Sequence, residues 1–137
     1  MAAVSNIKFY ENGVLKTPRE AAIGSTVRVE GDFTHDDPII SVQYWFRNKT
    51  NTTWLLLSGT MTYDSGDTYY MSDTVPSTYT NDEPINLDTG GNYFTFRINY
   101  AGGSSFVGGA QLWTATSQPP ETTPTVGTKY PLPAFKR

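Results

Sequence analysis

The 137-residue sequence has no cysteine and a single histidine. Without cysteine, the chain has no disulfide scaffold, thiolate nucleophile, iron–sulfur cluster or cysteine-bound zinc. Charged residues make up 17% of the chain, which is below the usual ~25% of globular proteins, and the formal net charge is −3. Nucleic-acid binders depend on surplus lysine and arginine, so we expect no nucleic-acid partner.

Long hydrophobic runs are also missing. No stretch approaches the ~18 apolar residues of a membrane span, and residues 1–6 lack the basic and then apolar start of a secretory signal. We therefore expect no signal peptide and no membrane partner. The length falls within the range of about 100–200 residues that one domain occupies.

Aromatic residues, by contrast, are plentiful, at 14% of the chain with nine Tyr, seven Phe and three Trp. Disordered chains are rich in charge and poor in aromatics, so disorder of the whole chain is excluded. A domain of this size buries roughly two thirds of its unfolded surface, which is enough for a hydrophobic core without covalent staples.

The hydrophobic pattern has a period of two, most clearly in residues 40–47 and 93–100. Seven or eight such segments, separated by turn signals about 8–12 residues apart, predict an all-β antiparallel sandwich. Each segment has one apolar face, so two stacked sheets cover every apolar face. Only Arg19–Ala22 has room for a helical turn, and Pro18 and Gly24 close it off.

The composition changes at Ser117. Five of the nine prolines lie in residues 117–137, which predicts an extended, polyproline-like arm after a sandwich of residues 1–116. The arm carries a charge of +2 and the remainder −5, so we expect the arm to dock on an acidic surface, its own or a neighbour's. Its anchors would be Tyr130, Leu132 and Phe135. A frayed tail is the alternative.

Part of the sequence resembles a known family. The run Ser41-Val42-Gln43-Tyr44-Trp45-Phe46-Arg47, followed by a polar loop and Trp54, resembles strands C and C′ of bacterial immunoglobulin-like or fibronectin-III-like domains. Tyr69-Tyr70 with Val75-Pro76 resembles the next strand. The segment from Asp88 to Phe96 is similar to the E–F corner of these domains. Its spacing is one residue longer than the D-x-G-x-Y pattern, so the sequence does not decide whether Tyr93 forms a tyrosine corner. The resemblance covers about residues 25–115. The sequence lacks the cysteines that form the family's disulfide pair.

This resemblance implies an immunoglobulin-like β-sandwich. Such modules occur as accessory domains of glycosidases, as adhesins, and as surface or decoration domains of tailed-phage virions. A small, cysteine-free chain that is rich in Thr and Gly and ends in a Pro-rich arm most resembles the phage group. The likeness implies a capsid-associated protein on the virion surface, made in the host cytoplasm. Its partners would be other virion or surface-assembly subunits, or a second copy.

Catalytic and metal signals are weak. His35 precedes Asp36, Asp37 and Pro38 in a turn, which favours a solvated turn residue over a triad member or metal ligand. The other loop acids are Asp64, Asp67, Asp82, Glu83 and Asp88. These acids are compatible with a calcium site, although no D-x-[DN]-x-[DN]-G string occurs. They are also compatible with the active site of a small hydrolase. We expect a non-enzyme with no cofactor and no metal.

The most specific prediction is a contact face. If Val42, Tyr44 and Phe46 face the core, strand geometry turns Trp45 and Arg47 outward. The same rule turns Tyr93 and Arg97 outward on the later strand, which neighbours the first in an immunoglobulin-like sandwich. We expect these four residues to form an interaction face, which Trp113 joins if its strand lies next in the sheet.

Three interpretations of this face remain open. Trp, Tyr and Arg are enriched at binding hot spots, which favours protein–protein contact. Aromatic rings also stack on sugars, so the alternative is a carbohydrate-binding or host-adhesion module that uses Trp45, Trp54 and Tyr93. In the third interpretation, arginine stems or the arm simply cover the aromatics.

Overall fold

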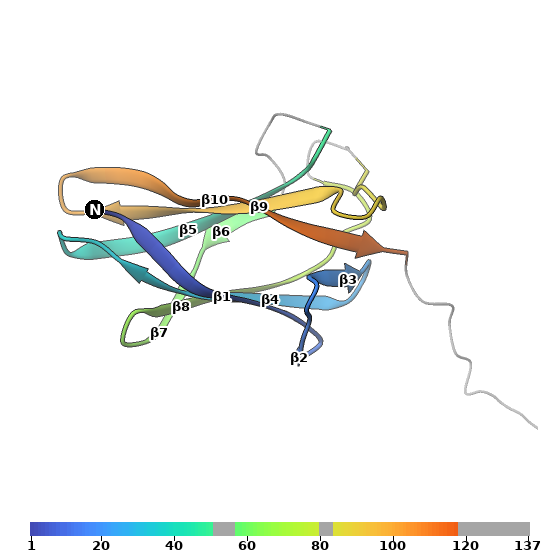
Figure 1. Cartoon of the computed structure of the whole chain (residues 1–137), viewed down its shortest axis with the longest axis horizontal. Coiled ribbons are helices and arrows are strands. Elements are labelled where there is room, and N and C mark those ends of the chain that lie inside the picture. Colours follow the sequence, from blue (N-terminus) through green and yellow to red (C-terminus); the bar gives the residue numbers. More distant parts are fainter. Residues whose placement is uncertain (51–56, 80–83, 118–137) are drawn as a thin grey trace, which may run out of the picture.

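The computed structural model describes residues 1–50, 57–79 and 84–117 and folds them into two stacked β-sheets (Figure 1). One sheet has the order β2-β1-β4-β8-β7 and the other β3-β10-β9-β5-β6. The strands are β1 (Ala3–Glu11), β2 (Val14–Leu15), β3 (Glu20–Ala22), β4 (Thr26–Thr34), β5 (Ile39–Asn48), β6 (Leu57–Thr60), β7 (Thr62–Ser65), β8 (Thr68–Thr74), β9 (Asn92–Tyr100) and β10 (Gly103–Thr116). The predicted β-sandwich is confirmed.

The described residues hold ten strands, so the expectation of seven or eight was too low. Two of the additional strands are short. β2 forms a hairpin with β1 across Asn12-Gly13, whose φ angles are both positive. β3 lies where a helical turn had room, and it pairs with β10 in parallel. Ala21 and Ala22 are buried there, because the chain crosses from one sheet to the other at this point.

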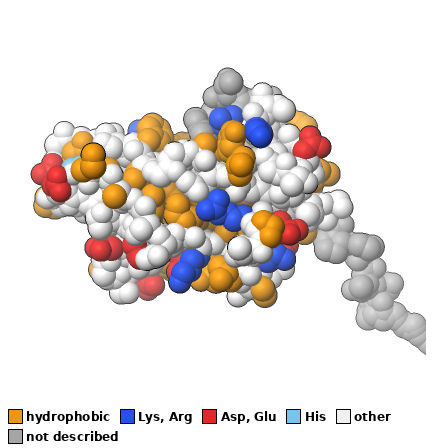
Figure 2. All heavy atoms as spheres, in the orientation of Figure 1, with side chains coloured by type: hydrophobic (Ala, Val, Ile, Leu, Met, Phe, Trp, Pro, Cys, Tyr) orange, Lys and Arg blue, Asp and Glu red, His pale blue; other side chains and the backbone are white. Residues whose placement is uncertain are grey.

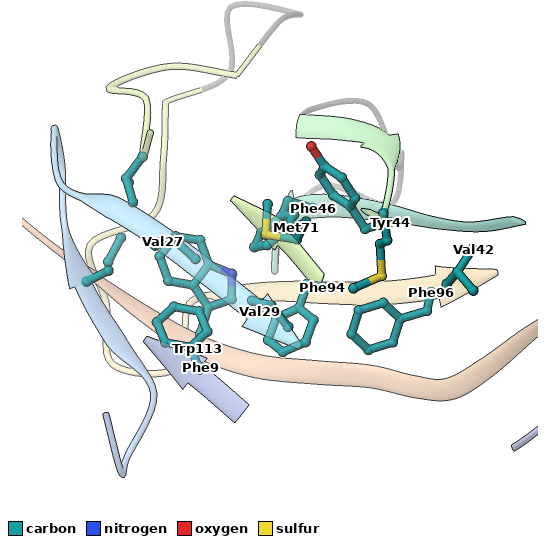
Figure 3. Close-up of a cluster of buried hydrophobic side chains, with 14 of the residues drawn as sticks. Phe9, Val27, Val29, Val42, Tyr44, Phe46, Met71, Phe94, Phe96 and Trp113 are labelled. Atoms are coloured by element: carbon teal, nitrogen blue, oxygen red, sulfur yellow. The ribbon is translucent and has the colours of Figure 1, made fainter. Parts of the chain in front are cut away.

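The core lies between the sheets, and the alternating residues of β5 and β9 face it. Val42, Tyr44 and Phe46 are at most 7% exposed, and Phe94, Phe96 and Ile98 are fully buried, as the pattern predicts. Rings from different strands meet, with 5.4 Å between the Phe46 and Phe94 centroids. Val29 and Met71 enter the same cluster from the opposite sheet (Figure 3).

Trp113 also belongs to this core, so its predicted place on the outer face was wrong. Its side chain is 3% exposed, and its ring centroid lies 5.7 Å from that of Phe9 and 5.8 Å from that of Phe46 (Figure 3). β10 does lie beside β9, but a bulge between Val107 and Gln111 adds two residues to it. Two added residues preserve the alternation, so Trp113 faces inward together with Val107.

The bulge supplies a testable prediction. Gly108 has φ +80°, and a Cβ there would lie 2.7 Å from Val4 Cγ1, whereas Gly109 has φ +63° and open space around it. Both alanine variants therefore strain the backbone, but only Gly108→Ala also overpacks β1. We expect Gly109→Ala to cost about 1 kcal/mol and Gly108→Ala about 1–3 kcal/mol more in urea unfolding. Equal losses would contradict the contact with β1.

The connection from Pro76 to Gly91 has two buried anchors in its described part. Tyr79 and Ile85 are 2% and 5% exposed. The Tyr79 hydroxyl donates to Asn92 Oδ1 at 2.8 Å, and Asn92 Nδ2 donates to the Asn86 carbonyl at 2.7 Å. Burial raises the pKa of the Tyr79 phenol, which keeps it a neutral donor. A buried tyrosine therefore anchors the connection at the start of β9. This tyrosine is Tyr79 and not Tyr93, the residue considered for a tyrosine corner, because Tyr93 lies half-buried on the outer face.

Some predictions fall outside the described residues. They concern Trp54 and the arm anchors Tyr130, Leu132 and Phe135. β10, the last strand described, ends at Thr116. Among the residues that the structure covers, no helix has the length and apolar character to cross a membrane.

Candidate contact surface

The outward side chains of β5, β9 and β10 form one continuous surface. β5 lies beside β9 with Arg47 opposite Tyr93 and Trp45 opposite Thr95. The guanidinium of Arg47 lies 4.7 Å from the Tyr93 ring centroid, and that of Arg97 lies 5.0 Å from the Trp45 ring centroid. The structure therefore brings together four of the five residues predicted for the face.

Phe106 takes the place expected for Trp113. It pairs with Arg97 across β9 and β10, and its side chain is 61% exposed. Its ring centroid lies 5.7 Å from that of Trp45, and the Arg97 guanidinium lies 5.9 Å from it. We call the set Trp45, Arg47, Tyr93, Arg97 and Phe106 the aromatic face.

The sequence did contain a signal for Phe106. Phe106 and Val107 are adjacent on one strand, so only one of them can face the core. Val107 is the buried one, at 7% exposure. The Gly108-Gly109 pair just beyond marks a bulge, and a bulge of one residue reverses the alternation whereas a bulge of two preserves it. The direction of Trp113 could therefore not be inferred from the sequence alone.

Hydrogen bonds fix the orientation of Arg97. Its Nη2 donates to Gln43 Oε1 at 2.8 Å, and Asn99 Nδ2 donates to the same oxygen at 2.9 Å and to Ser41 Oγ at 2.9 Å. Cation–π contact with an aromatic ring is worth about 0.5–1 kcal/mol at exposed sites. Arg97 is thus held against Trp45 and Phe106 by both kinds of interaction, and the face is pre-organised.

The aromatic face is cationic on a chain whose net charge is −3. The outward positions described on β5, β9 and β10 carry Arg47 and Arg97 and no carboxylate. They include Ser41, Gln43, Trp45, Arg47, Tyr93, Thr95, Arg97, Asn99, Ser104, Phe106, Leu112 and Thr114. The arginines do cover Trp45 and Tyr93, which are half-buried, as the packing interpretation predicts. Phe106 and Leu112, at 61% and 45% exposure, remain open to solvent.

His35 is engaged within its own loop. Its Nδ1 accepts a hydrogen bond of 2.8 Å from the Asp37 backbone N–H, and its ring stacks on Tyr100 with 3.8 Å between centroids. In the part of the chain that the structure describes, no three His, Asp or Glu side chains gather as a metal site. The described acids that left calcium open therefore do not form such a group, while Asp82 and Glu83 lie outside the described residues.

Comparison with known proteins adds no relative, because no protein-family model matches the chain and no curated sequence matches it significantly. What the structure defines is a two-sheet β-sandwich with a cationic aromatic face on one sheet. A function is therefore argued from this surface.

Proposed function

We propose that the protein is an immunoglobulin-like β-sandwich that acts without catalysis, by protein–protein contact through the aromatic face. The strand order supports the fold assignment. β1, β4, β8 and β7 follow the A-B-E-D order of immunoglobulin-like sheets, and β10, β9, β5 and β6 follow the order G-F-C-C′. The parallel pairing of β3 with β10 extends the second sheet.

One observation carries the proposal of contact, namely that Arg97 is fixed between Trp45 and a Phe106 that is 61% exposed. Aromatic residues and arginine dominate the energetics of interfaces, and rigid anchors lose little entropy on binding. Because the outward positions carry two arginines and no carboxylate, the matching partner surface is acidic. A specific interface of ordinary size would bury about 800 Å² on each side.

The proposal is non-enzymatic because the face lacks histidine and carboxylates, the groups that acid–base catalysis uses most often. Its described outward positions contain no histidine and no carboxylate, and their cations are the arginines Arg47 and Arg97. In the setting that the sequence resemblance implies, the partner is another subunit of a phage virion or a similar surface assembly, and the protein decorates its outside.

Photo-crosslinking tests the proposal. A benzophenone amino acid at Phe106 is compared with the same group at Val14, which is also 61% exposed but lies on β2 in the other sheet. In extract of the cells that make the protein, we expect one discrete protein adduct from position 106. The adduct should disappear when Trp45→Ala is added. Equal, diffuse labelling from both positions would contradict the proposal.

A carbohydrate-binding or host-adhesion module is the second candidate, since the exposed ring of Phe106 lies beside Trp45 and near the polar groups of Gln43 and Asn99. Such a ring pair can stack on a sugar while amides bind its hydroxyls. A glycan array separates the two candidates. Sugar binding by the full chain that Trp45→Ala abolishes would replace the protein-contact proposal with the glycan one.

A further inference from the structure

A groove of about 450 Å³ opens at the end of the sandwich where β10 begins, between the 35–38 loop and the β7–β8 turn. Its apolar lining includes Phe33, Pro38, Ile39 and Tyr69. The Phe33 and Tyr69 rings meet edge to face at 5.9 Å, and Tyr63 packs on Tyr69 at 5.2 Å. Asp36, Asp37 and Asp67 stand at its rim, and we call it the acidic groove.

This end of the molecule is strongly acidic. Residues 31–41 and 61–70 hold five aspartates and no lysine or arginine, and the left end of Figure 2 shows acidic side chains accordingly. One of the five, Asp36, pairs with the N-terminal ammonium, which lowers the pKa of its carboxyl. Hydrogen bonds from Asn6 and Thr68 lower the pKa of Asp32. Lys8 lies near enough to Asp32 to favour its charged form as well.

Two other grooves on the described residues differ from it in charge. The groove of about 340 Å³ beside Leu112 is lined by Lys8, Lys16 and Arg19 and is cationic. The groove of about 370 Å³ between Asn48 and Leu87 has no charged lining residue. We therefore expect a basic ligand to bind the acidic groove in preference to the other two grooves.

The sequence of this chain contains a basic segment in the residues that follow the described part. Residues 130–137 read Tyr-Pro-Leu-Pro-Ala-Phe-Lys-Arg, which places aromatic and proline residues directly before two cations. Proline-rich segments dock into aromatic-lined grooves because their backbone is pre-set and makes no internal hydrogen bonds. Carboxylates at the rim can pair with the adjoining lysine and arginine.

We propose that residues 130–137 of one copy bind the acidic groove of a second copy. Strand direction favours a second copy over the chain's own groove. β10 starts at the groove end, and its fourteen residues include a two-residue bulge, so at about 3.3 Å per residue Thr116 lies roughly 35 Å from that end. To bring Tyr130 to the chain's own groove, residues 117–129 would have to double back in a largely extended form. The inference is independent of the aromatic face, which can bind a partner whether or not the copies associate.

A charge exchange in the full-length protein tests this inference. One variant carries Asp37→Lys with Asp67→Lys in the groove, and a second carries Lys136→Glu with Arg137→Glu. Self-association is measured by sedimentation velocity at low salt. Protein concentrations up to about 1 mM make the measurement sensitive to weak association. Wild type should associate with rising concentration, each variant alone should associate at least tenfold more weakly, and a mixture of the two should recover association.

A matched control places the same two charge reversals at Asp73 and Asp88, outside the groove lining, and should associate like wild type. Thermal unfolding of every variant confirms that the sandwich remains folded. Three outcomes would each overturn the proposal. They are a wild type that stays monomeric, a wild type whose compact form does not depend on protein concentration, and a mixture of the two variants that fails to recover association. None of these outcomes would affect crosslinking from Phe106.

Discussion

Trp113→Ala is expected to lower the free energy of unfolding by about 3–5 kcal/mol, the usual cost of removing a large aromatic side chain from a core. The indole is 3% exposed and packs on Phe9 and Phe46, so its loss leaves a cavity between the two sheets (Figure 3). Urea unfolding measures this loss, and the slope of the transition shows whether the native state is otherwise intact.

Trp45→Ala is the matched control for Trp113→Ala. Trp45 is half-buried on the outer face and loses mainly its contacts with Arg97 and Phe106, so we expect a cost of about 1 kcal/mol. A larger loss at Trp45 than at Trp113 would mean that the two indoles had been assigned to the wrong faces, and the contact surface would have to be redrawn.

Asn92→Ala is expected to destabilise the protein by about 3–4 kcal/mol. Asn92 is fully buried, and its side chain accepts from the Tyr79 hydroxyl and donates to the Asn86 carbonyl. Each buried polar group that loses its partner costs roughly 1–3 kcal/mol. Thermal or urea unfolding measures the effect, and a loss below about 1 kcal/mol would contradict the buried network.

A double-mutant cycle separates this network from simple cavity formation. Tyr79→Phe removes only the hydroxyl and should cost about 1–2 kcal/mol in wild type but much less in Asn92→Ala. Tyr63→Phe is the control, because its hydroxyl donates to the Gly66 carbonyl at an exposed position, where the expected cost is below about 0.5 kcal/mol.

The architecture and most of the aromatic face could be predicted from the sequence, because both follow from alternation within single strands. Once Val42, Tyr44 and Phe46 are assigned to the core, Trp45 has one remaining direction, and β9 obeys the same rule. The pairing of the two strands then places Arg97 over Trp45. These relations need no knowledge of distant contacts.

The features that the sequence did not predict depend on contacts between distant segments. The inward direction of Trp113 depends on a two-residue bulge whose length is set by how β10 pairs with β9. The strand at Glu20–Ala22 exists because β10 lies beside it, since three residues have no strong preference of their own. The bond from Tyr79 to Asn92 joins residues on either side of a connection that has no repeating pattern.

Hydroxyl-radical footprinting of the protein, alone and within its native assembly, tests the central claim most directly. Trp45 and Phe106 should be oxidised several-fold more slowly in the assembly, because a partner covers the aromatic face. Leu87, which is 51% exposed and outside that face, should be oxidised equally in both states. Unchanged oxidation of Trp45 and Phe106 in an assembly that does contain the protein would contradict the account.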